Sequence, residues 1–316
     1  MEKNCWILGG TGFIGHELVK YLAETQRYRL HLLVHQNIPF RELENHALFT
    51  GNLEDFDWSW LKKYPPAVIF HMARLGGSNS ITRNLSSIKG AKANERLIDF
   101  LKDQAHPPLM VYVSGSLMYG PQEEGRIADE NSAWNPVSYA RYYFMGEKPW
   151  LNEQYYGTMD IRFARPGWIV GKGSWLKTFY LKPFLETGSI PLYGDGTQLM
   201  SLIHVEDCSR LVTRLAEMGK KKQNLNIMAG PPVTQQKFAE LLAAQLNTQV
   251  QRVPYEMIRK NYGQTVTEAL TASIPMTTTY PELYAGFEFR YPDARSIVES
   301  ISSFFKYEQR IFSKTP

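Results

Sequence analysis

The sequence predicts an α/β protein built on a doubly wound parallel sheet with a smaller, discontinuous C-terminal lobe. Three observations support this fold class. Short apolar segments alternate with segments of helical spacing, and a glycine-rich turn follows the first apolar segment. After about residue 170 the alternation of strand-like and helical segments becomes less regular. Continuous apolar strands are typical of parallel sheets that helices cover on both faces.

Strands are expected at 5–10, 28–34, 47–53, 65–73, 107–116 and 158–167, and helices at 13–24, at 81–103 and around 138–147. A loop-rich stretch then leads to a strand end and helix at 203–218, a strand at 224–230 and a helix at 234–246. This order predicts a dinucleotide-binding domain at 1–170 that is completed by about 201–230. Residues 171–200 and 231–316 would form the substrate-binding lobe.

The composition excludes several classes of protein. Of 316 residues, 43% are hydrophobic and 21% are charged, an ordinary globular balance, and the net charge of +4 is too small to indicate nucleic-acid binding. The two cysteines, Cys5 and Cys208, cannot form a disulfide framework and favour a reducing compartment. No apolar run approaches the roughly 20 residues of a membrane span, and no charged-then-apolar leader opens the chain. We expect a cytoplasmic protein that binds neither nucleic acid nor membranes.

The first strand and helix are joined by "GGTGFIG", with glycines at 9, 12 and 15. The first glycine permits a tight turn, the second lets the backbone approach a pyrophosphate, and the third lets the helix pack closely on the strand. Free N–H groups at the start of the helix would bind the phosphates. The strand–turn–helix context favours a Rossmann-type dinucleotide site over an ordinary tight turn.

The end of the second strand bears on the choice of cofactor. Val34 and His35 occupy the place where an acid would hold the free ribose hydroxyls of NAD, and the next acid is Glu42. The missing acid favours NADP over NAD, with His35, Arg41 or another base as the partner of the extra phosphate.

With these residues, the chain resembles the short-chain dehydrogenase/reductase superfamily in its extended and atypical NAD-dependent epimerase/dehydratase branches. The resemblance runs over nearly the whole length. It rests on the order and spacing of "GGTGFIG", "VSGSLMYG", "NPVSYARYYFMGE", "IRFARPGWIVG" and "GDGTQLMSLIHVED". The C-terminal "GFEFRYPD" is most similar to an atypical subgroup known as epimerase family proteins.

The resemblance implies hydride transfer between a small-molecule substrate and a nicotinamide. A tyrosine moves the matching proton, a lysine lowers its pKa, and a Ser or Thr hydroxyl binds the substrate oxygen. A homodimer built from paired helices would also be typical. The implied cofactor contacts are Gly9, Thr11, Gly12, Phe13, Ile14, Gly15, His35, Asn52, Leu53, Ala73, Arg74, Ser114, Pro166, Gly167 and Trp168.

The catalytic residues of that family carry over only in part. Tyr139 matches the tyrosine, but Tyr143 stands where the lysine belongs. The hydroxyl position is Gly115, with Ser114 and Ser116 on either side. Sugar-nucleotide epimerases often carry an arginine for the substrate diphosphate where this chain has Met200. The candidate catalytic residues are therefore Tyr139, Ser114, Ser116 and Tyr143.

Without the lysine, a tyrosine would be a poor base but a usable acid. An unassisted tyrosine has a pKa near ~10, so only about one molecule in a thousand is phenolate at pH 7. Arg141 and Lys148 lie at the wrong helical spacing to replace the lysine. We expect an NAD(P)-dependent oxidoreductase or epimerase with a degenerate triad, acting on a small carbonyl, hydroxyl or sugar-type compound. The alternative is an inactive NADP(H)-binding sensor or scaffold.

The histidines have structural interpretations that fit this picture. His31 and His35 lie on one strand and give no metal-site geometry, so no metal is expected. His71 follows an apolar strand and His204 precedes a helix, and both are interpreted as structural residues.

Overall fold

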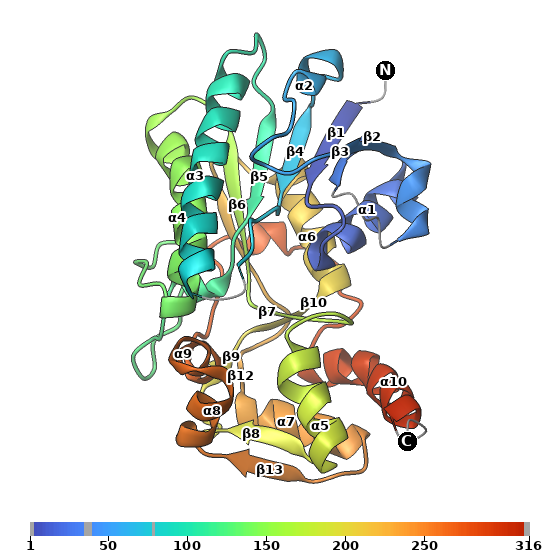
Figure 1. Cartoon of the computed structure of the whole chain (residues 1–316), viewed down its shortest axis with the longest axis vertical. Coiled ribbons are helices and arrows are strands. Elements are labelled where there is room, and N and C mark those ends of the chain that lie inside the picture. Colours follow the sequence, from blue (N-terminus) through green and yellow to red (C-terminus); the bar gives the residue numbers. More distant parts are fainter. Residues whose placement is uncertain (1–2, 35–39, 78–79, 313–316) are drawn as a thin grey trace.

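Seven parallel strands form the central sheet in the residues that the computed structural model describes, 3–34, 40–77 and 80–312 (Figure 1). The strand order is β11, β6, β5, β4, β1, β2, β3. The strands are β1 (Lys3–Leu8), β2 (Tyr28–Val34), β3 (Ala47–Thr50), β4 (Val68–His71), β5 (Leu109–Val113), β6 (Ile161–Pro166) and β11 (Asn224–Ile227). The chain winds outward from β1 in both directions, so the predicted doubly wound sheet is confirmed.

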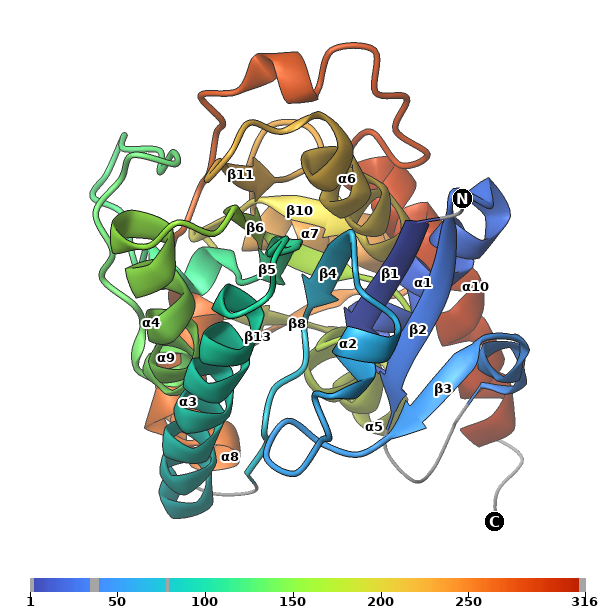
Figure 2. The same ribbon diagram turned by 90° about the horizontal axis from the view of Figure 1, so that it is seen from above.

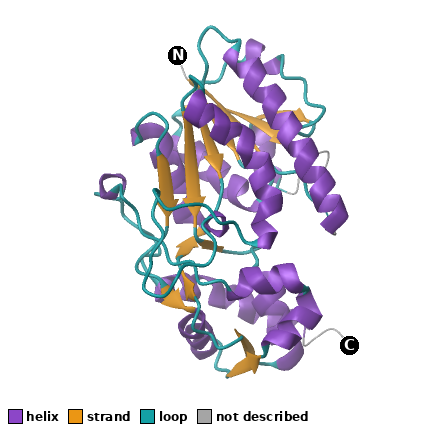
Figure 3. Ribbon diagram, turned by 90° about the vertical axis from the view of Figure 1, so that its left-hand side faces the viewer, coloured by secondary structure: helices purple, strands orange, loops and turns teal. Residues whose placement is uncertain are grey.

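Helices cover both faces of this sheet (Figures 2 and 3). On one face α1 (Phe13–Thr25) packs against α6 (Val205–Met218), and on the other α3 (Ser80–Lys102) packs against α4 (Ser138–Tyr156). Alternate side chains of β1 enter the two cores: Ile7 packs with the α1 and α6 residues, and Trp6 packs with those of α3 and α4. Burial on both faces explains why the strands read as continuous apolar runs.

A smaller lobe lies beyond the carboxyl edge of the sheet, at the bottom of Figure 1. Its strands form three pairs: β7 with β10, β9 with β12, and β8 with β13. The strands are β7 (Trp168–Val170), β8 (Ile190–Tyr193), β9 (Leu199–Met200), β10 (Leu202–His204), β12 (Val233–Thr234) and β13 (Val250–Val253). The helices are α5 (Lys182–Thr187), α7 (Gln235–Gln245), α8 (Tyr255–Tyr262), α9 (Gln264–Thr271) and α10 (Ala294–Phe312).

The chain enters this lobe twice. It leaves the sheet after β6, returns for α6 and β11, and then leaves it again. The stretch between residues 171 and 202 that was expected to be loop-rich contains α5, β8 and β9, and α8, α9 and α10 had no sequence prediction. Helix α5 and strand β8 were hard to predict because glycines at 188, 194 and 196 interrupt the pattern, and β8 pairs with β13 some sixty residues later.

Short elements complete the fold. They are α2 (Trp60–Lys63) and single helical turns at Arg41–Asn45, Ser116–Met118, Lys177–Leu181 and Pro281–Leu283. Cys5 and Cys208 are both buried free thiols, and burial raises the pKa of each. Among the described helices, none is both long and apolar enough to cross a membrane.

Candidate functional site

The glycine turn between β1 and α1 is as tight as its spacing predicts. Gly9 has φ +96°, and a Cβ there would lie 2.8 Å from the Ala73 backbone nitrogen. A Cβ on Gly15 would collide with the Gly9 carbonyl oxygen, so α1 could not approach the strand with any other residue. No side chain caps α1, and its first turn holds no acid. The N–H groups of that turn are therefore suited to bind an anion, which fits a dinucleotide's phosphates.

The other residues expected to contact the cofactor follow the carboxyl ends of successive strands. Because these ends meet at one edge of a parallel sheet, residues far apart in sequence come together there. His35 lies outside the described residues. The remaining ones are Thr11 to Gly15 on the α1 turn, Asn52 and Leu53 after β3, and Ala73 and Arg74 after β4. Ser114 follows β5, and Pro166 to Trp168 lie at the end of β6 and the start of β7.

A cavity of about 360 Å³ opens where this edge faces the smaller lobe. The cavity is lined from β5 by residues 114–116, from α4 by Tyr139 and Tyr143, and from β6 and β7 by residues 166–169. Helix α9 and the segment around Trp175 complete the lining. All four candidate catalytic residues therefore line one cavity.

The two tyrosines of α4 form a hydrogen-bonded pair. The Tyr143 hydroxyl donates to the Tyr139 oxygen at 2.9 Å, and their rings meet edge to face at 5.3 Å. Burial raises the pKa of Tyr143, which stays neutral at physiological pH and keeps its proton for this bond. The Tyr139 oxygen accepts, so its own proton is directed elsewhere.

Two arginines from beyond β4 supply cations near this pair. The Arg74 guanidinium lies 4.4 Å from the centre of the Tyr143 ring, and that of Arg83 lies 5.7 Å from the centre of the Tyr139 ring. Arg141 and Lys148 are exposed, and Arg141 donates to the Pro136 carbonyl. The positive charge near the tyrosines thus comes from another part of the chain, which helical spacing within α4 could not reveal.

Ser114 and Ser116 differ in their partners. The Ser114 hydroxyl donates to Glu147 at 2.5 Å. The Ser116 hydroxyl has no hydrogen-bond partner among the described residues, although the residue lines the cavity. The Ser116 hydroxyl can therefore donate a hydrogen bond to a ligand oxygen in the cavity, whereas the Ser114 hydroxyl already donates to Glu147.

Glu147 and Arg165 form a buried charged pair behind Ser114 that sequence analysis missed. Glu147 is 1% exposed and Arg165 is fully buried, with 3.5 Å between Nη2 and Oε1. Burial raises the pKa of Glu147, while Arg165, the Ser114 hydroxyl and Arg74 oppose that shift. The available signal was the spacing of Tyr139, Tyr143 and Glu147, which places all three on one face of α4.

Aromatic rings surround the guanidinium of Arg165. Its central carbon lies 4.6 Å from the Trp134 ring centre and 5.6 Å from those of Tyr119 and Phe163. The Nε and Nη1 atoms have no partner among the described residues. Glu147 is therefore the carboxylate that balances this buried charge.

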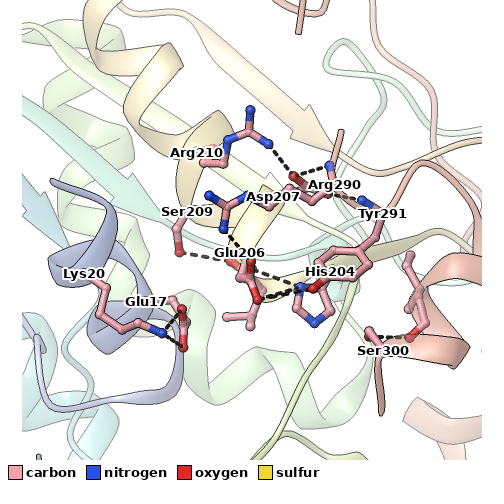
Figure 4. A network of polar contacts seen from close by, with 12 residues as sticks. Glu17, Lys20, His204, Glu206, Asp207, Ser209, Arg210, Arg290, Tyr291 and Ser300 are labelled. Atoms are coloured by element: carbon pink, nitrogen blue, oxygen red, sulfur yellow. Dashed lines mark hydrogen bonds and ion pairs between the residues drawn. The ribbon is translucent and has the colours of Figure 1, made fainter. Parts of the chain in front are cut away.

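His204 belongs to a polar network that joins α6 to the C-terminal segment (Figure 4). Its Nδ1 accepts from the Glu206 N–H at 3.4 Å, and its ring lies 3.9 Å from that of Tyr291. Asp207, fully buried, accepts from the backbone N–H groups of Arg290 and Tyr291 at 3.1 and 2.9 Å. The sequence motifs "IHVED" and "GFEFRYPD" are thus parts of one structural unit.

Comparison with known proteins agrees with this fold. A model of the NAD dependent epimerase/dehydratase family matches residues 5–228. The epimerase family protein YfhF of Bacillus subtilis is 26% identical over 255 residues, which cover 76% of this chain and 78% of that relative.

Two solved structures have the same fold. The human epimerase family protein SDR39U1 with NADPH has a TM-score of 0.75 at 19% identity, covering 95% of this chain and 99% of that chain. The UDP-glucuronic acid 4-epimerase of Bacillus cereus, in complex with UDP-glucuronic acid and NAD, has a TM-score of 0.76 at 17% identity, covering 96% and 99%. These two structures thus contain different nicotinamide cofactors, NADPH in the first and NAD in the second.

Proposed function

The chain belongs to the NAD dependent epimerase/dehydratase family, and we propose that it is an NADP(H)-preferring oxidoreductase or epimerase with a degenerate catalytic triad. Its substrate would be a small carbonyl, hydroxyl or sugar-type compound, and Tyr139 would be the proton donor. The observation that carries this proposal is the hydrogen bond from Tyr143 to the Tyr139 oxygen at 2.9 Å, in the wall of the cavity. The test is oxidation of NADPH, followed by absorbance, with a panel of small carbonyl compounds.

Tyr139 would transfer its proton to the substrate oxygen. As the proton leaves, negative charge develops on the Tyr139 oxygen, and the Tyr143 hydroxyl already donates to that atom. The guanidinium groups of Arg74 and Arg83, next to the two rings, favour the same charge. Ser116, which lines the same cavity, would also donate its hydroxyl to the substrate oxygen.

The bound cofactor would supply the hydride. The chain's part is to hold the phosphates at the α1 turn and to keep the nicotinamide end beside residues 114–116 and 166–168. Because Tyr143 is a neutral donor and not a cation, the pair supports proton donation better than proton abstraction. This favours reduction of a carbonyl over oxidation of an alcohol.

The alternative function is that of a cofactor-binding sensor or scaffold without turnover. Its support is Tyr143 in the position where the family lysine is expected. Both functions require cofactor binding, so only turnover and its dependence on Tyr139 separate them.

We predict that NADPH raises the melting temperature more than NADH does at equal concentration. The reason is that no acid follows β2 to hold the free ribose hydroxyls of NADH, whereas the exposed Arg41 side chain is available to the extra phosphate. Thermal unfolding of the full-length protein measures this. Arg41→Ala should weaken NADPH binding by about tenfold, the loss of one charged contact, and leave NADH binding unchanged. A larger shift with NADH would contradict the cofactor assignment.

We also propose that the protein is a homodimer that pairs through α3. Ile81, Leu85 and Ile88 lie on one face of this helix and are 73%, 55% and 37% exposed. The double variant Ile81→Lys with Leu85→Lys should therefore be a monomer in light scattering after size exclusion. Glu256→Lys, which makes the same change in net charge at an exposed position of α8, is the control and should remain a dimer. A monomeric wild-type protein would refute this prediction.

A further inference from the structure

The part of the cavity wall that the smaller lobe contributes is apolar apart from Ser174. It is built by the smaller lobe from Trp168, Trp175, Phe179, Val266 and Leu270. The rings of Trp168 and Trp175 meet edge to face at 4.8 Å, and Trp175 Nε1 donates to the Ile169 carbonyl at 2.9 Å. The indole N–H of Trp175 is thus hydrogen-bonded to the backbone, and the apolar face of its ring can contact a ligand.

Charge is almost absent from this cavity. Among the described residues that line it, Arg74 is the one charged side chain. Its Nη2 donates to the carbonyls of Val113 and Ser114 at 3.2 and 3.3 Å, and its guanidinium stacks on Tyr143. Arg74 is therefore already engaged by the backbone and by Tyr143, and the described lining includes no charged side chain from the smaller lobe.

Met200, in the position of the family's diphosphate-binding arginine, does not supply a replacement. It is 3% exposed, pairs with Val233 in the β9–β12 ribbon, and is not among the lining residues. A diphosphate placed against this wall would lose its water and gain no cation, which strongly disfavours binding.

We infer that the site takes a small, uncharged carbonyl compound with an apolar, aromatic or aliphatic body, and not a nucleotide sugar. This inference rests on the proposed function, because it assigns the carbonyl oxygen to Tyr139 and Ser116 and the body to the apolar wall. The cavity of about 360 Å³ must also hold the nicotinamide end of the cofactor, so the substrate is small.

The test measures binding apart from turnover. The full-length protein, saturated with NADP⁺, is titrated with cyclohexanone, benzaldehyde and 4-phenylbutan-2-one, and separately with UDP-glucose. Tryptophan fluorescence reports occupancy because Trp168 and Trp175 line the wall. At least one uncharged probe should bind about tenfold or more tighter than UDP-glucose. Equal or tighter binding of UDP-glucose, or binding of no uncharged probe, would overturn the inference.

A charged variant tests the wall directly. Val266→Lys, at a half-buried lining position of α9, should weaken binding of the uncharged probe by about tenfold and strengthen that of UDP-glucose. Gln264→Lys adds the same charge at an exposed position of α9 and should change neither. If Val266→Lys is unstable, Val266→Gln takes its place, with weaker binding of the uncharged probe expected. Unchanged affinities in the folded variant would overturn the assignment of this wall.

The two proposals fail in different ways. Tight binding of a ketone without any oxidation of NADPH would refute the proposed function and leave the assignment of the apolar site intact. Turnover of a nucleotide sugar that depends on Tyr139 would support the proposed function and refute the apolar site.

Discussion

Replacing Tyr139 with Phe is expected to slow carbonyl reduction by about 10²–10⁴-fold, the usual contribution of a general acid. The substitution removes the hydroxyl that receives the Tyr143 hydrogen bond and keeps the ring in the cavity wall. Binding of NADPH should not change, because the substitution leaves intact the α1 turn at which we expect the phosphates to bind. Turnover is measured by NADPH absorbance, and cofactor binding by thermal shift.

Two further variants of α4 refine this test. Tyr143→Phe keeps the proton donor but removes its supporting hydrogen bond, so a smaller loss of about tenfold is expected. Tyr142→Phe removes a neighbouring hydroxyl that does not line the cavity, and it should leave turnover unchanged. If turnover survives in Tyr139→Phe, Tyr139 is not the acid; if no carbonyl is turned over at all, the sensor remains the better interpretation.

Arg165→Met is expected to lower the free energy of unfolding by about 3–5 kcal/mol at pH 8, because it leaves a buried carboxylate without its counter-charge. Both partners are buried, with Glu147 at 1% exposure, and Met keeps most of the volume between Trp134 and Tyr119. Denaturant unfolding at pH 5, 6.5 and 8 measures the loss.

The loss should grow as the pH rises. Burial already raises the pKa of Glu147 above its ordinary value of 4.5, and Arg165 is the strongest group opposing that shift. Without Arg165 the folded-state pKa rises further, so the folded protein binds a proton that the unfolded chain has released. Stability then falls from about pH 4.5 upward until the pH reaches the folded-state pKa. The difference between the variant and the wild type should therefore be smallest at pH 5.

A double variant provides the control. Adding Glu147→Gln to Arg165→Met removes the titrating group but keeps an acceptor for the Ser114 hydroxyl. Stability at pH 8 should recover in part, and the extra pH dependence should disappear. A loss in Arg165→Met that is the same at all three pH values would mean that lost packing, not charge, explains its cost.

Local features were predictable from the sequence because they depend on neighbouring residues. The glycine turn requires small residues at 9, 12 and 15 in any chain that packs this way, and the structure contains that turn. The alternation of strands and helices followed from periodicity alone. Tyr139 was chosen from a motif; the structure places it in a cavity, and its catalytic role remains a prediction.

Partners across the fold were not predictable in this way. The position of Glu147 on the face of Tyr139 could be read from helical spacing, but its bonds to Ser114 and Arg165 arise because β5 and β6 are neighbours in the sheet. The placement of Arg74 over Tyr143 likewise depends on how the end of β4 meets α4.

The sequence by itself determined a doubly wound α/β fold and a tight glycine turn, because backbone geometry and burial act over short stretches of chain; its family followed from the resemblance of its motifs. Only the tertiary structure decided which charges lie near the tyrosines, which serine hydroxyl is already bonded, and that the smaller lobe contributes a mostly apolar part of the cavity wall. These depend on side chains from distant segments meeting in space, where low dielectric and exclusion of water set the strength of each contact.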